Sequence, residues 1–180
     1  MPTESERRFL IPIAWFDSQI DVLHARFYEV QQGYLNLDPD RTVRVRLLND
    51  PQNVWVKSQQ AYITVKGRKD NSGSGLEFEY DVPYEDARKM LTWLCVGHTV
   101  SKTRYVINVY DHTVEMDVFH GDNEGLIIAE VEDRPEVFVA PDVWVEVTDQ
   151  PGTFSNASLA QHPFSKSGGT PLLDGKKRFL

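Results

Sequence analysis

Polar and apolar residues alternate with period two along most of the chain, which indicates β-strands with one apolar face. The alternation predicts strands over these ranges: Glu4 to Ile11, Phe27 to Leu35, Thr42 to Asn49, Ala61 to Lys66, Leu76 to Val82, Lys102 to Tyr110, His112 to Phe119, Ile127 to Glu132 and Val143 to Thr148. Stretches rich in Gly, Ser and Asn at 71–75 and 121–125 are typical of turns between such strands. Because the helix-strand spacing of a parallel sheet is absent, we expect a mainly β (α+β) fold with antiparallel strands.

Helical periodicity interrupts the strands in two places. The clearer helix is expected from about Tyr84 to Val96, since Pro83 suits the start of a helix and acidic residues follow it. A weaker helical pattern runs from about Trp15 to Leu23, and residues 155–160 predict one further short helix. The length of 180 residues favours one domain, which we place at 1–164, with a flexible tail at 165–180.

Charged residues are segregated by sign from strand to strand. Basic residues share one face of their strands at Arg44 and Arg46 and again at Lys102 and Arg104, and Lys66 ends a strand of the same kind. Acidic residues stand two apart on four other strands: Glu4 and Glu6, Glu77 and Glu79, Glu115 and Asp117, and Glu130 and Glu132. For any single strand, a solvated sheet face remains the ordinary explanation. Such a face predicts interspersed signs, however, so the pattern as a whole favours a barrel with its charged face inward and its apolar face outward.

A charged interior makes physical sense only around a highly charged ligand, because buried charges are costly unless they are paired, hydrated or liganded. A barrel of about eight strands encloses room for one small molecule. Cations alone would suit a polyphosphate, whereas the carboxylates beside them would repel it unless a hard cation bridges the two. Mg²⁺ or Mn²⁺ is the natural oxygen-liganded choice. The sequence therefore predicts a metal-bridged polyphosphate site.

Composition narrows the class of protein. Hydrophobic residues make up 41% of the chain and charged residues 26%, which indicates a globular protein with a core. The net charge of −8 disfavours nucleic acid as a partner, and no apolar run approaches the length of a membrane span. One cysteine, Cys95, excludes a disulfide framework, and the charged N-terminal residues do not resemble a signal peptide. We therefore expect a cytoplasmic protein without membrane association.

Several short motifs occur in an order that resembles one known family. They are Glu4-Ser5-Glu6-Arg7-Arg8, Gln32-Gly33-Tyr34-Leu35, Arg41-Thr42-Val43-Arg44-Val45-Arg46, Tyr62-Ile63-Thr64-Val65-Lys66-Gly67, Glu77-Phe78-Glu79-Tyr80, Lys102-Thr103-Arg104-Tyr105, Glu115-Met116-Asp117-Val118-Phe119 and Ala129-Glu130-Val131-Glu132. Each is weak alone, but their order over residues 4–164 is specific. The sequence resembles the triphosphate tunnel metalloenzymes, also called the CYTH domain family.

The resemblance implies a closed antiparallel eight-stranded β-barrel with helices outside, a divalent metal, and substrates that end in a triphosphate. It implies that Glu4, Glu6, Glu130 and Glu132 act on the metals, and catalysis is expected of Glu130, Glu132 and Lys102. The expected substrate-binding residues are Arg8, Arg44, Arg46, Lys66, Lys102, Arg104, Glu77, Glu79, Glu115 and Asp117. The sequence departs from the family at Arg8, where the opening motif has a lysine; a guanidinium is a planar bidentate donor rather than a point charge.

These observations predict a metal-dependent hydrolase that cleaves inorganic triphosphate to diphosphate and phosphate, as a monomer or homodimer. A nucleoside triphosphatase is the second reading and a class IV-type adenylate cyclase the third. A reading of another class is a polyphosphate- or nucleotide-binding module without turnover. The acidic chain lacks the basic or aromatic approach expected of an RNA-directed enzyme, which places inorganic triphosphate first.

Overall fold

The computed structural model describes residues 6–23, 25–38, 40–53, 58–68, 75–132, 135–148 and 151–165. These residues form one nine-stranded sheet with the order β5-β4-β3-β2-β6-β7-β8-β1-β9, in which neighbouring strands are antiparallel. The strands are β1 (Arg7–Leu10), β2 (Arg26–Tyr34), β3 (Arg41–Asn49), β4 (Gln59–Gly67), β5 (Glu77–Asp81), β6 (Val96–Val109), β7 (His112–His120), β8 (Ile127–Val131) and β9 (Val145–Glu146). The helices are α1 (Ile13–Leu23), α2 (Tyr84–Trp93), α3 (Pro151–Phe154) and α4 (Asn156–Gln161), with short 3₁₀ turns η1 (Gly121–Asn123) and η2 (Pro135–Val137). None of these helices combines the length and the apolar character that crossing a membrane requires.

Each predicted strand range contains a strand, and both predicted helices and the short helix at 155–160 are present. The largest boundary error is at β6, which begins at Val96 rather than at Lys102. For the same reason α2 ends at Trp93 rather than at Val96. The predicted turn at 121–125 is confirmed by η1. Residues 1–5, the turn residues 71–74 and the tail at 166–180 lie outside the described residues.

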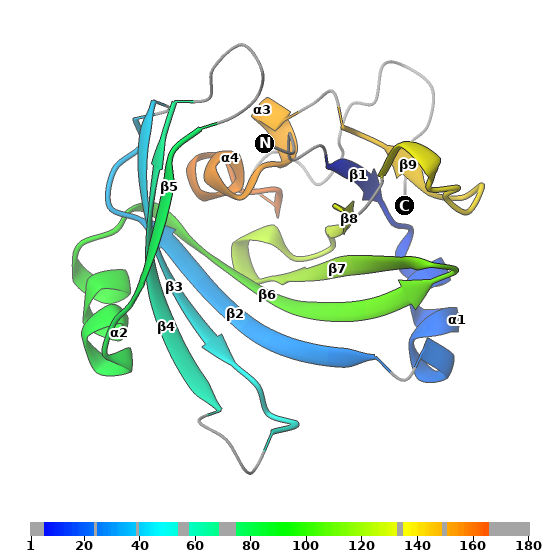
Figure 1. Cartoon of the computed structure of the whole chain (residues 1–180), viewed down its shortest axis with the longest axis horizontal. Coiled ribbons are helices and arrows are strands. Elements are labelled where there is room, and N and C mark those ends of the chain that lie inside the picture. Colours follow the sequence, from blue (N-terminus) through cyan, green and yellow to red (C-terminus); the bar gives the residue numbers. More distant parts are fainter. Residues whose placement is uncertain are drawn as a thin grey trace.

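The expectation of a closed eight-stranded barrel is wrong. The sheet has nine strands and is open, with β5 at one end and β9 at the other. Closure requires backbone hydrogen bonds between the two end strands, but β9 pairs only over two residues of β1, and all five residues of β5 are exposed. Figure 1 shows the strongly curved sheet with α2 on its outer side and with α3 and α4 on its inner side. Open curvature replaces the closed tunnel in the described part of the chain.

The outer face of the sheet is apolar where helices cover it, as the sequence predicted. Under α2 it forms a cluster centred on four buried side chains: Val45, Leu47, Ala61 and Ala87. A larger outer cluster lies near α1 and η2, with its buried members Phe9, Ile11, Phe16, Ile107, Val114, Met116, Ile127, Ala129, Val131, Phe138 and Trp144. Because successive side chains of a strand point to opposite faces, this packing turns the charged alternate residues inward.

The inner face is divided into an apolar part and a charged part. The apolar part is covered by α3 and α4, which contribute Phe154, Leu159 and Ala160 to a cluster with Val100 and Phe119. Helix α4 also contacts β6 and β2 directly. The two helices therefore limit the charged part of the inner face at one side.

An irregularity in β6 lets α4 approach the sheet closely. The pairing of β2 with β6 shifts register between Gln32, opposite Val100, and Tyr34, opposite Val96. Gly97 lies within this shift with a φ of +75°, and a Cβ built there would stand 2.6 Å from the carbonyl oxygen of Ala160 in α4. Only glycine combines that backbone conformation with such a short approach.

Replacing Gly97 by Ala should therefore destabilise the fold by more than its backbone conformation alone explains. Gly121 has a φ of +60° and no atom within 4 Å of the built Cβ, so Gly121→Ala is the matched control. The control should lower the free energy of unfolding by about 1–2 kcal/mol, the usual penalty of a left-handed conformation for an L-residue. Gly97→Ala should lower it clearly further in urea unfolding, and equal losses for the two variants would contradict this account of α4.

Candidate active site

A charged and polar cavity of about 450 Å³ lies on the inner face of the sheet. Its lining residues come from β1, β3, β4, β5, β6 and β8, from residues beside β1 and β8, and from α4. They are Glu6, Arg8, Arg44, Arg46, Lys66, Glu77, Glu79, Arg104, Glu130, Glu132 and Asn156. No aromatic or aliphatic side chain belongs to this set, so the cavity suits a small, highly charged ligand rather than an apolar one.

The strand register explains why these residues meet. Arg8 of β1 stands opposite Glu130 of β8, and Glu130 in turn stands opposite Glu115 of β7. On the other wall, Arg44 of β3 stands opposite Thr64 of β4, which faces Glu79 of β5. Residues directly opposite each other in neighbouring strands point to the same face, and here that face is the cavity.

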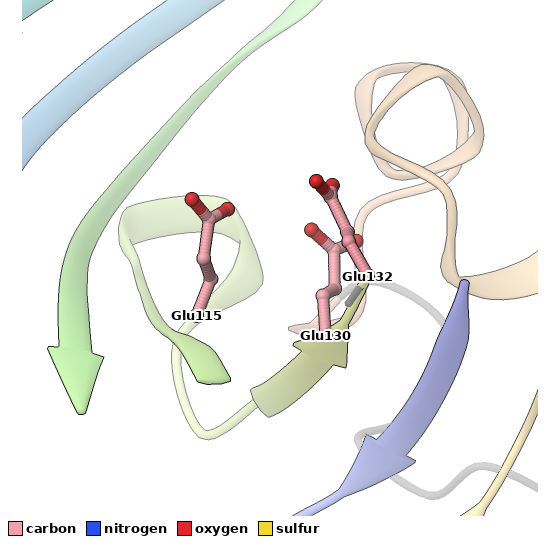
Figure 2. Close-up of side chains that lie close together, drawn as sticks. All are labelled: Glu115, Glu130 and Glu132. Carbon is pink, nitrogen blue, oxygen red and sulfur yellow. The ribbon is translucent and has the colours of Figure 1, made fainter. Parts of the chain in front are cut away.

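Three carboxylates converge at one wall of the cavity. Figure 2 shows Glu115 from β7 beside Glu130 from β8 and Glu132 just beyond that strand, with their carboxylates turned toward the same space. One ligand atom from each residue lies within 4.8 Å of the others. Burial, together with Glu115, Glu130 and Glu6, raises the pKa of Glu132. Such mutual repulsion is relieved by a hard cation with oxygen ligands, so these residues fit a divalent metal.

Arg104 of β6 contacts three carboxylates on the neighbouring strands β7 and β8. It donates from Nε to Asp117 Oδ1 at 2.7 Å and from Nη2 to Asp117 Oδ2 at 2.8 Å, which is a bidentate pair. It also contacts Glu115 and places Nη2 3.2 Å from Glu130 Oε2. Burial would lower the pKa of Arg104, but Asp117, Glu115 and Glu130 more than offset it and raise that pKa. Its guanidinium is therefore firmly charged and held in one orientation.

Lys102 and Asp117 lie behind the cavity wall. The Lys102 side chain is 0% exposed, forms an ion pair with Asp117, and reaches Asn156 Oδ1 of α4 at 3.4 Å. Burial lowers the pKa of Lys102 to about 8, against the opposing effect of Asp117. For Asp117, burial would raise the pKa, but Lys102 and Arg104 outweigh it and lower the pKa. In this arrangement Asp117 fixes Arg104, and Lys102 supports Asp117.

Arg8 joins Glu6, just before β1, to Glu130 of β8. Its Nε lies 3.1 Å from Glu130 Oε1, and its Nη2 lies 2.6 Å from Glu6 Oε1. A lysine ammonium is a single point charge and lacks the fork that spans both acids in this way. The departure from the family motif thus has a defined geometric use in this chain.

The opposite wall is basic and only partly neutralised. Lys66 pairs with Glu77 at 2.9 Å, with both side chains about two-fifths exposed at 42% and 41%. Arg44 donates from Nη2 to Thr64 Oγ1 at 2.9 Å and lies 3.5 Å from Glu79. Its buried Nε has no hydrogen-bond partner among the described residues. An orphaned donor beside a cavity indicates a place for an acceptor oxygen from a ligand.

Arg46 differs from the other cations of the cavity in its hydrogen-bond partner. It makes one side-chain hydrogen bond, from Nε to Gln32 Oε1 at 3.2 Å, and it pairs with no carboxylate in the part of the chain that the structure describes. Burial lowers the pKa of Arg46 to about 10, and the neighbouring Arg44 and Arg104 act in the same direction. A desolvated cation next to two others is a strong site for an anion.

The structure brings most of the predicted site residues together. Those that line the cavity are Arg8, Arg44, Arg46, Lys66, Arg104, Glu6, Glu77, Glu79, Glu130 and Glu132. Glu115 joins the carboxylate cluster, which the sequence had not grouped it with, whereas Lys102 and Asp117 lie behind the wall. Glu4, a predicted metal residue, lies outside the described residues.

Sequence reasoning missed three polar residues of this region: Gln32, Thr64 and Asn156. Gln32 and Thr64 occupy inward positions of β2 and β4, opposite Arg46 and Arg44, so the same alternation that singled out the charges could have found them. Asn156 had no such signal, because α4 reaches the cavity only through tertiary packing.

The chain was compared with protein-family models, with curated proteins and with solved structures. None of the family models matches it, whereas a curated relative and solved structures do. The chain is 36% identical over 168 residues to an inorganic triphosphatase of Acetivibrio thermocellus, and the match covers 91% of this chain and 97% of that protein. A crystal structure of the inorganic triphosphatase NE1496 superposes with a TM-score of 0.60 at 25% identity, covering 87% of this chain and 97% of the other.

A more distant likeness extends to HpAC1 from Hippeastrum, an adenylyl cyclase candidate for which a dominant triphosphatase activity is described. The TM-score is 0.50 at 14% identity, over 73% of this chain and 80% of that one, and this likeness shows the fold alone. Three findings lead to one conclusion: the 36% identity with a triphosphatase over most of the chain, the curved antiparallel sheet, and a cavity lined by both basic and acidic residues. The chain belongs to the triphosphate tunnel metalloenzyme family, the CYTH proteins.

Proposed function

We propose that this protein is a divalent-metal-dependent hydrolase of inorganic triphosphate, which it cleaves to diphosphate and phosphate. The observation that carries the proposal is Arg46, a desolvated cation held by an amide rather than a carboxylate. A polyanion in the cavity would supply the missing negative charge. The inorganic triphosphatase of Acetivibrio thermocellus, to which the chain is extensively similar, supports the same substrate.

The basic wall supplies the binding of phosphate. Arg46 and the unpartnered Nε of Arg44 offer donors to phosphate oxygens, and Lys66 stands at the more exposed edge. Arginine suits this role because its planar fork matches two oxygens of one phosphoryl group. These residues would hold the substrate and disperse the charge that develops on the leaving diphosphate.

The carboxylates of Glu115, Glu130 and Glu132 on the acidic wall would hold Mg²⁺ or Mn²⁺. Glu6 is linked to this cluster by Arg8, which forms ion pairs with both Glu6 and Glu130. The family resemblance implies that Glu4, Glu6, Glu130 and Glu132 act on the metals, and the carboxylate cluster adds Glu115 to that proposal. When bound, such a metal neutralises phosphate oxygens and lowers the pKa of a bound water. Mg²⁺ and Mn²⁺ both prefer oxygen ligands such as these carboxylates.

Glu132 is the best candidate to orient the attacking water and accept its proton. Glu130 is engaged by Arg8 and Arg104, whereas no described residue forms an ion pair with Glu132. Without an ion-pair partner among the described residues, the carboxylate of Glu132 is available to a water. The water oxygen forms a bond to the terminal phosphorus, the bond to the bridging oxygen breaks, and diphosphate leaves. Arg104, held by Asp117 and Lys102, would stabilise the transferred phosphoryl group.

The cavity lining favours inorganic triphosphate over a nucleotide. Among the described residues no aromatic or apolar side chain lines it, so they offer no stacking surface to a nucleobase. Nucleoside triphosphate hydrolysis and cyclisation of ATP are therefore the second and third readings. Retention of the carboxylate cluster disfavours a pure binding module, because acids beside a polyanion weaken its binding unless metal bridges them.

A substrate panel tests the proposal directly. Inorganic triphosphate, ATP, GTP and thiamine triphosphate are incubated with Mg²⁺, with Mn²⁺ and with a chelator, and the products are separated. We expect diphosphate and phosphate from triphosphate, with the highest kcat/KM of the set and no turnover under the chelator. Cyclic AMP as the main product, or undiminished hydrolysis under the chelator, would contradict the proposal.

Replacing Glu130 by Gln should separate catalysis from binding. The substitution removes one metal-ligating charge and leaves the basic wall intact, so turnover should fall by about 100-fold or more, in line with the loss of a metal ligand's support. Triphosphate binding, measured by calorimetry, should persist. Glu85→Gln on the exposed side of α2 is the matched control and should turn over normally. Tight binding without turnover in the unaltered protein would favour the binding-module reading.

Replacing Glu132 by Gln should stabilise the metal-free protein near neutral pH. The folded-state pKa of Glu132 is raised above its ordinary value of 4.5, so the folded protein holds a proton that the unfolded chain releases in the window above 4.5. The contribution of Glu132 to stability is therefore lost as pH rises through the raised pKa. Urea unfolding under a chelator should show Glu132→Gln more stable than wild type near neutral pH, with the gap closing toward pH 4.5.

Glu124→Gln, in an exposed turn, is the control for this measurement and should leave the pH dependence unchanged. A gap that widens on acidification would refute the assigned direction. Added Mg²⁺ should reverse the order of the two proteins, because the metal favours the ionised carboxylate.

A further inference from the structure

Gln32 is a fully buried polar residue next to the cavity, with 0% of its surface exposed. It lies on β2, directly opposite Arg46 of β3 and Val100 of β6. Its amide oxygen accepts the hydrogen bond from Arg46 Nε at 3.2 Å, and its Nε2 lies 3.5 Å from the hydroxyl of Tyr34. The amide thus has neighbours on both sides, and its oxygen is the end that faces the guanidinium.

Gln32 is an exception among the partners of the inner-face cations. The described neighbours of the other cations include carboxylates: Glu6 and Glu130 for Arg8, Glu79 for Arg44, Glu77 for Lys66, Asp117 for Lys102, and Asp117, Glu115 and Glu130 for Arg104. Of this set, Arg46 alone has a neutral side chain and no carboxylate among its described hydrogen-bond and ion-pair partners. A carboxylate in the same place would fit sterically and would cancel the charge.

We propose that Gln32 is a positioning residue for anion binding: its amide fixes the Arg46 guanidinium through Nε while it leaves the positive charge uncompensated for the ligand. The hydrogen bond at Nε leaves the two terminal nitrogens without another side-chain hydrogen bond in the described part of the chain. Fixing the cation in advance reduces the ordering that the ligand must impose, which strengthens binding. The identity of that ligand as triphosphate rests on the proposed function.

Two substitutions at this position test the proposal. Gln32→Met keeps the length and burial of the side chain but removes the acceptor. Gln32→Glu keeps the shape and adds the charge that would neutralise Arg46. Because a hydrogen bond to a charged group contributes more than a neutral one, we expect triphosphate to bind about tenfold more weakly to the first variant. For the second we expect about 100-fold, since a buried ion pair would compete with the ligand.

Binding is measured by calorimetry with inorganic triphosphate and Mg²⁺ in the Glu130→Gln background, in which slow turnover leaves the ligand intact during the measurement. Initial rates with Mg²⁺ should show KM rising in parallel, with a smaller fall in kcat, because most of the negative charge that Arg46 binds is already present in the bound substrate. Gln31→Met, the neighbouring position on the outer, exposed side of β2, is the matched control and should bind like wild type. Thermal unfolding reports on folding, and if the Met variant fails to fold, the Glu variant decides.

A double-mutant cycle separates positioning from general damage. In an Arg46→Ala background, both substitutions at Gln32 should change binding by less than about twofold, because the residue through which they act is absent. Wild-type affinity in both variants, or equal weakening with and without Arg46, would overturn the inference. Triphosphate binding without turnover in the unaltered protein would count against the proposed function alone, and absence of any binding would overturn both.

Discussion

Removing ionised groups from water is the constraint on which this structure depends, because the inner face of the sheet gathers arginines, a lysine and glutamates around one cavity. The apolar outer face can pack under its helices only if the alternate residues turn inward with their charges. The fold therefore has to neutralise them internally. Asp117 does so between Lys102 and Arg104, and Arg8 does so between Glu6 and Glu130.

At two places on the inner face the charges are not fully neutralised by neighbouring side chains, and these two places define the site. On one wall Arg46 has an amide where its neighbours have carboxylates. On the other, Glu115, Glu130 and Glu132 crowd together, and the pKa of Glu132 is raised by burial and by its neighbours. One wall thus favours an anion and the other a cation. A metal complex of triphosphate would supply both charges in a single ligand and would relieve the repulsion within each of the two clusters of like charge.

The sheet is open, and α4 packs against its inner face. Apolar residues of α3 and α4 cover part of the inner face of the open sheet. Gly97 permits this close contact, and the contact delivers Asn156 to the cavity and to Lys102. The helices thereby confine the charged part of the inner face while leaving β5 and β9 unpaired with each other among the described residues.

The sequence by itself determined the strands, the two main helices, the inward direction of the charges and the membership of most of the site, because period-two alternation assigns each residue to a face regardless of distant contacts. It could not decide closure, since that depends on whether the end strands meet after the twist of every intervening pair has accumulated. Nor could it tell which charges would pair. The grouping of Glu115 with Glu130 and Glu132, the burial of Lys102 behind Asp117, and the arrival of Asn156 all depend on side chains from separate elements meeting in space. Pairing energies of charges fall with distance and rise with burial, and both quantities exist only once the chain has folded.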